Sequence, residues 1–295
     1  MRDFNEHTAT AAVLDRLSGA QDPRFKEIMT AVISHLHAAI REVEPTIEEW
    51  MAAIQFLTAT GQKCDDQRQE FILLSDTLGV SMLVDAINNR KPSGATESTV
   101  LGPFYVAGAP HLKMGDTISK DGKGDPTHVS GRVLDQDGAP IKGALLDVWQ
   151  TSSDGFYNTQ DPSQPEMNLR GLFETGADGR FFFRTVKPSS YPIPTDGPVG
   201  KMLLAMGRHP MRPAHIHFIV GAPGFEPVTT HIFVDGDEYL DSDAVFGVKD
   251  SLIEPFVLHD EPGRAGELGL ANPFYTAAHD FTLTRLRKRS AATAA

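Results

Sequence analysis

The sequence has 295 residues, of which 40% are hydrophobic and 22% are charged, as expected for a globular chain of one large or two ordinary domains. Its 39 acidic residues outnumber its 27 basic residues, and the net charge of −12 argues against nucleic acid or an anionic membrane surface as the main partner. An anionic substrate would therefore need a local attraction, from a metal ion or a buried arginine.

The single cysteine, Cys64, excludes an internal disulfide and is typical of a reducing compartment. The first residues lack the apolar run of a signal peptide, and no stretch approaches the roughly 18 apolar residues that span a bilayer. We therefore expect a cytoplasmic protein.

Residues 8–90 show the periodicity of helices, and we assign residues 1–95 to a helical N-terminal domain. Over residues 25–43 the apolar positions recur at the i, i+3, i+4, i+7 spacing of an amphipathic helix. These positions are Phe25, Ile28, Met29, Val32, Ile33, Leu36, Ile40 and Val43. Such a stripe usually faces the core of its own domain and less often a partner.

Three further helices are predicted in this domain. Pro45 ends the first helix, and Thr46–Glu49 has the capping-box pattern that begins the next one, which ends near Gly61. A third helix is expected over residues 66–79, and a short fourth one over residues 82–87.

Residues 88–126 are rich in Gly, Pro, Ser and Lys and are interpreted as a connection, of which residues 96–126 are assigned to a segment that lines the functional site. Gly102–Val106 lies within it. Long connections with little structure of their own often carry function.

From residue 127 the pattern changes to short strands separated by turn residues, which predicts a β-sandwich over residues 127–287 and a flexible tail over residues 288–295. Asp137–Gly138 separates two predicted strands, residues 129–134 and 141–149, and is a strong hairpin signal. The fold class expected is mostly β, with an α-helical N-terminal domain and a β-sandwich catalytic core.

Further strands are expected over residues 180–186, 214–220, 228–234 and 281–286. The proline-rich residues 187–198 are predicted to form a loop.

The segment Arg212–His217 predicts the start of a strand, and this strand contains a His-x-His pair. Because side chains alternate along a strand, His215 and His217 point to the same face, about 7 Å apart, and can share one metal ion. For an isolated pair the better explanation would be two histidines on a polar strand face by chance.

Two tyrosines lie in loops next to this strand system. Tyr157 follows a predicted strand, and Tyr191 lies in the proline-rich loop, where the backbone is fixed by its neighbours. Taken singly, Tyr157 suits a turn aromatic and Tyr191 a loop side chain packed on prolines. The chain has only five tyrosines, however, and with the two histidines these residues have the right chemistry for a ferric site.

In these motifs the sequence resembles the intradiol ring-cleavage dioxygenases, in their catechol 1,2-dioxygenase branch. The motifs are Gly131–Val133, Pro140–Ala144, Asp147–Gln150, Tyr157, Tyr191–Pro194 and Arg212–His217, together with Gly102–Val106 and the N-terminal helices. Within the branch, three segments are most similar to hydroxyquinol 1,2-dioxygenases: Leu73–Asp76, Thr230–Val234 and Asp243–Val248. Plain catechol enzymes tend to carry glutamine where this chain has His231.

The resemblance implies one non-haem Fe(III) per subunit, held by Tyr157, Tyr191, His215 and His217 with hydroxide as a fifth ligand. Two tyrosinates and one hydroxide cancel the charge of a ferric ion, and a catecholate that displaces the hydroxide and one tyrosinate keeps the site neutral. By the family pattern, Tyr191 is the catalytic ligand that leaves, and Arg212 stabilises charge that develops beside the ring. Without a metal, Arg212 would be a surface arginine at a strand start.

The substrate-binding residues implied by the resemblance are Leu73, Asp76, Val100, Leu101, Gly102, Pro103, Ile193, Pro194, His231 and Val245. Asp76 would accept a hydrogen bond from the third hydroxyl of hydroxyquinol, although a lone helical aspartate more often lies on a solvated face. His231 is assigned with equal weight to support of the site and to a simple strand position.

The reaction expected is cleavage of hydroxyquinol by dioxygen, between its two adjacent hydroxyl-bearing carbons, to give maleylacetate. The alternatives are a catechol or substituted-catechol 1,2-dioxygenase that yields cis,cis-muconates, and a non-catalytic transthyretin-like binding module. The resemblance also implies a homodimer formed through the N-terminal helices, with a phospholipid between them.

Overall fold

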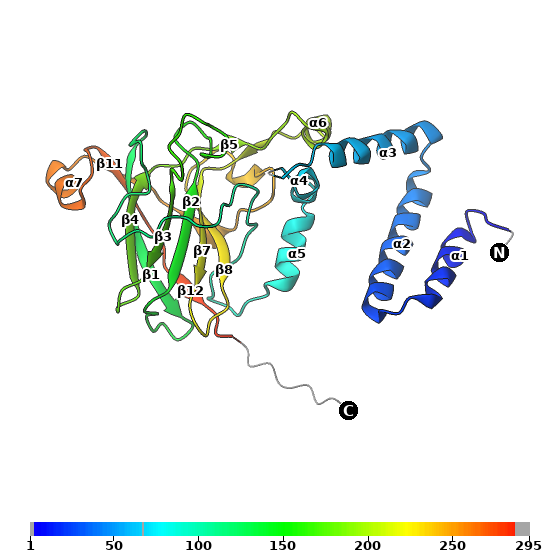
Figure 1. The fold of residues 1–295 in the computed structure, drawn as a ribbon, viewed down its shortest axis with the longest axis horizontal. Helices are drawn as coiled ribbons and strands as arrows, with labels where there is room; N and C mark the ends of the chain where they lie inside the picture. The colour runs from blue at the N-terminus through cyan, green and yellow to red at the C-terminus, as the bar shows by residue number, and fades with distance from the viewer. Residues whose placement is uncertain (1–2, 67, 287–295) are drawn as a thin grey trace, which may run out of the picture. The chain divides into compact units, whose positions relative to one another are not determined.

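The computed structural model describes residues 3–66 and 68–286, and the chain divides into two compact units, residues 1–59 and 60–295 (Figure 1). The tail predicted for residues 288–295 lies outside the described residues. The domain limits predicted at residues 95 and 126 follow composition and stay predictions.

The first unit is helical, as predicted. Its elements are α1 (Ala9–Asp15), the 3₁₀ turn η1 (Arg16–Gly19), α2 (Pro23–Val43) and most of α3 (Ile47–Gln62). The Asp22 carboxylate accepts the first free N–H groups of α2, and Glu44 ends that helix in the left-handed conformation. The capping box is confirmed: the Thr46 N–H donates to Glu49 at 2.8 Å, and the Glu49 N–H donates to the Thr46 hydroxyl at 3.2 Å.

The apolar stripe of α2 is not covered within this unit. Side chains that a core would bury are about half exposed or more: Phe25, Ile28, Val32, Leu36, Ile40 and Val43. On α3 the same holds for Ile47, Trp50, Met51, Ile54 and Leu57. The usual interpretation of such a stripe, the core of its own domain, therefore does not apply here.

The other two predicted helices, α4 (Glu70–Thr77) and α5 (Val80–Asn88), belong to the second unit. The third helix begins at Glu70, four residues later than expected. Gly79 joins α4 to α5 with a φ of +73°, a left-handed conformation that favours glycine.

Two five-stranded sheets form the centre of this unit (Figure 1). The first has the order β10 (Val257–His259), β11 (Phe274–Ala278), β1 (Pro126–Asp135), β12 (Phe281–Leu283), with β4 (Arg180–Val186) also paired to β1. The second has the order β3 (Arg170–Glu174), β2 (Leu145–Gln150), β7 (His215–Gly221), β8 (Val228–Val234), β9 (Ile253–Glu254). Tyr191–Pro192 (β5) and Met211–Arg212 (β6) form a separate pair.

The hydrophobic core lies between the two sheets and draws side chains from both. The first sheet contributes Val129, Val133, Phe181, Phe183 and Phe281, and the second contributes Leu146, Val148, Ile216, Phe218 and Val220. Because Ile216 and Phe218 point inward, the alternation of β7 turns His215 and His217 to the outer face of the second sheet. The predicted sandwich with an N-terminal helical domain is confirmed.

The predicted hairpin at Asp137–Gly138 is wrong as a strand pairing. The turn itself closes, since the Ile141 N–H donates to the Val133 carbonyl at 2.8 Å. The chain then crosses over, and β1 and β2 lie in different sheets. Turn chemistry fixes only the local reversal, whereas strand pairing follows where the apolar faces meet.

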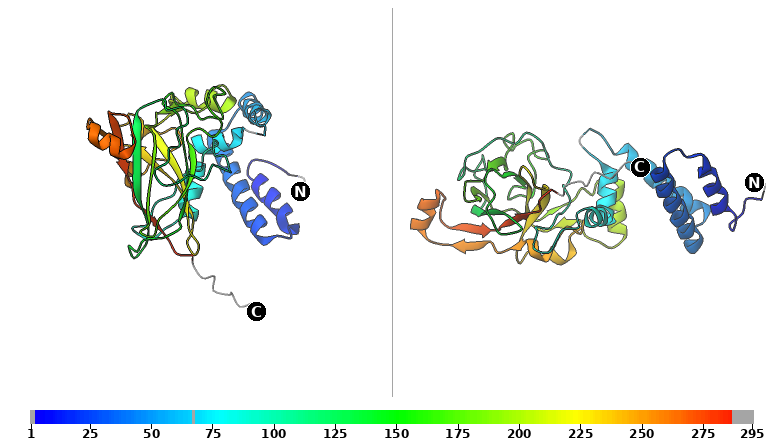
Figure 2. Two further views of the ribbon diagram at one scale, coloured as in Figure 1. Left: turned by 60° about the vertical axis from the view of Figure 1, so that its left-hand side comes forward. Right: turned by 90° about the horizontal axis from the view of Figure 1, so that it is seen from below.

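Short helices α6 (Pro198–Ala205) and α7 (Pro262–Leu268), and the 3₁₀ turns η2 (Leu240–Ser242) and η3 (Asp250–Leu252), were not predicted. Two views of the ribbon show α7 and β11 at the end of the second unit opposite α4 and α5 (Figure 2). Within residues 3–66 and 68–286, no helix has the length and apolar character needed to cross a membrane.

Candidate metal centre

The outer face of the second sheet carries a row of ring side chains. In the register of the sheet, Trp149 of β2 lies opposite His217 of β7, and His217 lies opposite His231 of β8. The ring centroids of the two histidines are 4.1 Å apart. All three residues are buried, and the connection packs on each of them: Gly102 on His217, Tyr105 on Trp149 and Thr99 on His231.

Four donor atoms of buried side chains meet beside this row. Tyr157 Oη lies 2.8 Å from His217 Nε2 and 3.3 Å from Tyr191 Oη. His217 Nε2 lies 3.1 Å from His215 Nε2. Ligands that bond one metal ion at about 2.0–2.2 Å are themselves roughly 3 Å apart, so this spacing fits a shared ion.

A hydrogen bond of His215 fixes the tautomer of its ring so that one nitrogen is free to bind a metal. Its Nδ1 lies 2.7 Å from the Pro213 carbonyl, which can only accept, so Nδ1 carries the proton and Nε2 presents a lone pair. Burial, aided by the charge of Arg212, lowers the pKa of His215 to about 3. Burial and the neighbouring histidines likewise hold the pKa of His217 well below its usual value. Both imidazoles are therefore neutral and able to bind a cation.

For Tyr157, burial shifts the pKa in the opposite direction, away from the form that binds a metal. Burial, together with the neighbouring Tyr191, raises the pKa of the Tyr157 phenol well above its usual value. A phenolate at this position needs a cation of high charge beside it, which is what a ferric ion supplies. The chemistry and the burial of Tyr157, Tyr191, His215 and His217 thus fit a trivalent metal ion.

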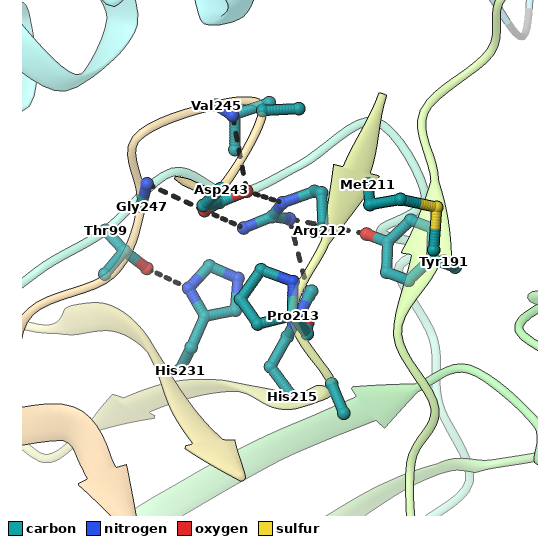
Figure 3. Close-up of polar contacts among 12 residues, drawn as sticks. Thr99, Tyr191, Met211, Arg212, Pro213, His215, His231, Asp243, Val245 and Gly247 are labelled. Atoms are coloured by element: carbon teal, nitrogen blue, oxygen red, sulfur yellow. Dashed lines mark hydrogen bonds and ion pairs between the residues drawn. The ribbon is translucent and has the colours of Figure 1, made fainter. Parts of the chain in front are cut away.

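Arg212 lies directly against this set (Figure 3). The β5–β6 pair places Arg212 opposite Tyr191, and its Nη1 atom lies 3.3 Å from Tyr191 Oη and 3.4 Å from His215 Nε2. Burial opposes its charge most strongly, but the Asp243 carboxylate and the two tyrosines, Tyr191 and Tyr157, together outweigh burial and raise the pKa of Arg212. The surface position considered for this arginine is excluded, because it is only 2% exposed.

His231 lies at the rim of the set. The Thr99 hydroxyl is hydrogen-bonded to its Nδ1 atom (Figure 3), and its Nε2 atom is buried without a partner among the described residues. One donor atom from each of His215, His217 and His231 lies within 4.8 Å of the others. Because Nδ1 is occupied by Thr99, the free Nε2 is the atom that can act on the site.

A cleft of about 800 Å³ lies on the tyrosine side of the site. Three of the predicted substrate-binding residues line it, namely Leu73, Pro103 and Pro194. Phe104 also lines it and stacks on Tyr157, with ring centroids 4.6 Å apart. None of the four donor residues lines the cleft itself, and the Phe104 ring lies between the cleft and Tyr157.

Of the other predicted substrate-binding residues, Gly102, Val100, Leu101, Ile193 and Val245 do not line this cleft. A Cβ atom on Gly102 would lie 3.2 Å from the His217 ring. The Val245 N–H donates to Asp243 at 3.3 Å, and the Ile193 N–H donates to the Pro210 carbonyl at 2.9 Å. Val100 and Leu101 precede Gly102 in the connection, and Leu101 is exposed.

Asp76 does not lie on a solvated face. It is 4% exposed, and burial raises its carboxyl pKa, while Arg212 and Asp243 act on it electrostatically. The more usual interpretation of a lone helical aspartate is therefore wrong, and this carboxyl group belongs to the surroundings of Arg212.

Sequence reasoning missed several residues that support the site. Arg170 at the start of β3 is 2% exposed and donates to the Asn158 side chain at 2.7 Å and to the Phe104 carbonyl at 2.8 Å. It thereby ties the connection to the loop that carries Tyr157. Thr99 was missed too, and Asp243 was named only as part of the segment Asp243–Val248, without a role. Local spacing does not reveal these roles, because each residue acts on a partner far along the chain.

Comparison with known proteins agrees with this geometry. Residues 100–282 match a family described as "Dioxygenase", and residues 22–96 match one described as "Catechol dioxygenase N terminus". A hydroxyquinol 1,2-dioxygenase of Rhizobium sp. (strain MTP-10005) is 58% identical over 96% of this chain and 96% of its own length.

Solved structures show the same similarity. A hydroxyquinol 1,2-dioxygenase from Pseudomonas putida DLL-E4 is 50% identical, with a TM-score of 0.90 over 95% of this chain and 99% of its own. A catechol 1,2-dioxygenase from Pseudomonas arvilla C-1 is 31% identical, with a TM-score of 0.83 over 98% of this chain and 96% of its own. The chain belongs to the intradiol ring-cleavage dioxygenase family and is an enzyme of that class.

Proposed function

We propose that this protein is a ferric, non-haem dioxygenase that cleaves hydroxyquinol with dioxygen to give maleylacetate. The observation that carries the proposal is the buried set of two phenol oxygens and two imidazole nitrogens, joined by distances of 2.8–3.3 Å. One Fe(III) per subunit would be held by Tyr157, Tyr191, His215 and His217. When bound, the ferric ion would draw electron density from the diol ring and make it reactive towards dioxygen.

Tyr191 and Arg212 have the positions that the proposed catalysis needs. Tyr191 Oη lies between Tyr157 Oη and Arg212 Nη1, at 3.3 Å from each, and would hold a proton given up by a hydroxyl group of the diol. Arg212 would place a fixed positive charge beside the ring, where negative charge develops during cleavage. The buried Nε2 of His231 would give a further hydrogen-bonding group at this rim.

Hydroxyquinol is favoured over catechol by the surroundings of Asp76. Its carboxyl group is buried near Arg212, beside the Ser81 side chain, and would accept a hydrogen bond from the third hydroxyl of hydroxyquinol. Relatives that are named as hydroxyquinol 1,2-dioxygenases are 58% and 50% identical to this chain, whereas two named as catechol 1,2-dioxygenases are 41% and 31% identical. Catechol or a substituted catechol is the second candidate.

The assembly proposed is a homodimer formed through the N-terminal helices. The uncovered apolar stripes of α2 and α3 support it, because side chains such as Val32 and Leu36 are more than half exposed. A phospholipid acyl chain between the helices would be chemically compatible with the same apolar surface.

The experiment is to purify the protein, measure its iron content and visible spectrum, and follow dioxygen uptake with hydroxyquinol and catechol side by side. One iron per subunit, a red colour from tyrosinate-to-iron charge transfer and faster uptake with hydroxyquinol are expected. A colourless, iron-free protein without uptake would support the transthyretin-like binding module and contradict the proposal. Faster uptake with catechol would replace the substrate and keep the metal centre.

A further inference from the structure

We propose that Asp243 is a positioning residue, which fixes the guanidinium of Arg212 so that only one edge faces the reacting ring. The inference rests on the proposed function of Arg212 and deepens it. Asp243 is not part of the donor set and does not line the cleft on the tyrosine side of the site.

The contact between the two side chains is a buried, two-point ion pair (Figure 3). Arg212 Nε lies 3.1 Å from Asp243 Oδ1, and Arg212 Nη2 lies 3.3 Å from Oδ2. The exposed fractions of the two side chains are 3% and 2%. A planar guanidinium held at two of its three nitrogens cannot rotate without breaking both contacts, so its remaining Nη1 edge is directed towards Tyr191 and His215.

The carboxylate is itself fixed by the backbone of its own loop. The Val245 N–H donates to Oδ1 at 3.3 Å, and the Gly247 N–H donates to Oδ2 at 2.9 Å (Figure 3). Each oxygen therefore accepts one bond from Arg212 and one from the loop. Asp243 has no spare contact for a substrate, which is why its role has to run through Arg212.

The loop that carries Asp243 is anchored to the turn between α4 and α5 of the same unit. Arg208 donates to the carbonyls of Thr77 and Ala244 and lies over the Phe246 ring, 4.6 Å from its centroid. Phe246 adopts a φ of +59°, a conformation that is uncommon for a bulky residue and needs support from its surroundings. A Cβ atom on Gly79 would contact that ring at 3.4 Å.

Gly247 leaves little room for a side chain beside the ion pair. A Cβ atom built there would lie 3.1 Å from Arg212 Nη2 and 3.1 Å from Asp243 Oδ2. An alanine at this position would press on the ion pair without changing any charge. Gly247→Ala therefore perturbs the orientation of Arg212 independently of Asp243→Asn, which keeps the side-chain shape and removes the charge.

The test measures steady-state kinetics per bound iron, with hydroxyquinol, in Asp243→Asn, Gly247→Ala and Arg212→Gln. The control is Asp241→Asn, which changes the same type of residue at an exposed position two residues away. We expect Asp243→Asn and Gly247→Ala to keep iron and the charge-transfer band while kcat falls by roughly 10- to 100-fold and KM changes little. The control should match the wild type.

The decisive measurement is a double-mutant cycle. If Asp243 acts through Arg212, adding Asp243→Asn to Arg212→Gln should cause no further loss of kcat. Additive losses, or wild-type kcat in Asp243→Asn, would overturn the inference. Loss of iron in Asp243→Asn with iron kept in Arg212→Gln would also overturn it, since Asp243 would then support the metal centre directly.

These outcomes are distinct from a failure of the proposed function. A wild-type protein that consumes no dioxygen with either diol refutes the dioxygenase assignment. Full turnover in Arg212→Gln refutes the role of Arg212, whereas reduced turnover there with full turnover in Asp243→Asn refutes only the positioning role.

Discussion

The indole of Trp149 stacks on the imidazole of His217, with ring centroids 4.5 Å apart and an angle of 13° between the planes. The two residues lie opposite each other on β2 and β7, so the sheet register itself brings them together. His217 Nδ1 has no hydrogen-bond partner among the described residues. The stacked indole therefore helps to orient the imidazole plane from the Nδ1 side, while Nε2 is held 2.8 Å from Tyr157 Oη.

Loss of this imidazole should abolish metal binding. We expect His217→Ala to purify with little iron and without the charge-transfer band, because it removes one of four proposed protein ligands. The comparison is His231→Gln, which keeps a buried polar group at the rim and should retain iron. Full iron content and colour in His217→Ala would contradict the ligand assignment.

The two tyrosines should respond differently to loss of the hydroxyl group. Tyr157 Oη contacts both His217 and Tyr191, so Tyr157→Phe should lose iron or shift its visible band. Tyr191→Phe should still bind the diol, while turnover falls by roughly 10²-fold or more because no phenol takes up its proton. Iron analysis, substrate titration followed in the visible spectrum, and dioxygen uptake separate the two effects. Unchanged turnover in Tyr191→Phe would refute its catalytic role.

Asp76 should decide the preference between the two diols. Removing a charged hydrogen-bond partner usually costs enough to change an affinity by about 10- to 100-fold, so Asp76→Leu should lower kcat/KM for hydroxyquinol by that amount and leave catechol less affected. Asp76→Asn, which can still accept a hydrogen bond, should lose less. The ratio of kcat/KM for the two substrates is the measurement, and an equal ratio in all three proteins would exclude contact with the third hydroxyl.

Acid should destabilise the metal-free protein more than the iron-loaded one. Burial lowers the pKa of His215 to about 3 and holds those of His217 and His231 well below their usual value. The unfolded chain therefore takes up protons that the folded chain does not, and the stability of the iron-free protein falls as the pH drops below about 6.5.

The measurement for this effect is the melting temperature of the iron-free protein between pH 7 and the onset of acid unfolding. Iron-bound imidazoles have no free lone pair, so the loaded protein should keep its melting temperature further into the acid range. His231→Gln removes one buried imidazole and should flatten the curve of the iron-free protein. A melting temperature that is independent of pH in this range would show that the histidines are not held neutral.

Periodic and local features of the fold could be predicted from the sequence. The amphipathic spacing identified α2, and the capping box identified the start of α3, because both depend on residues within a few positions of one another. The His-x-His alternation predicted that two imidazoles share a face. The same local reasoning failed at Asp137–Gly138, where the turn forms but the strands pair elsewhere.

The candidate site shows the same division. Its donor residues could be named from short motifs, whereas their supporting contacts join residues far apart, such as Thr99 and His231, which are 132 positions apart. The ion pair of Arg212 with Asp243 spans 31 positions and joins β6 to a loop beyond β8.

The sequence by itself thus determined which side chains could bind a metal and which local elements carry them, because strand and helix periods act over a few residues. Only the tertiary structure decided that Asp76 is buried, that Trp149 orients His217 and that Asp243 fixes Arg212. The physical reason is that burial and charge pairing depend on which elements pack together, and that choice is made by the whole chain rather than by neighbouring residues.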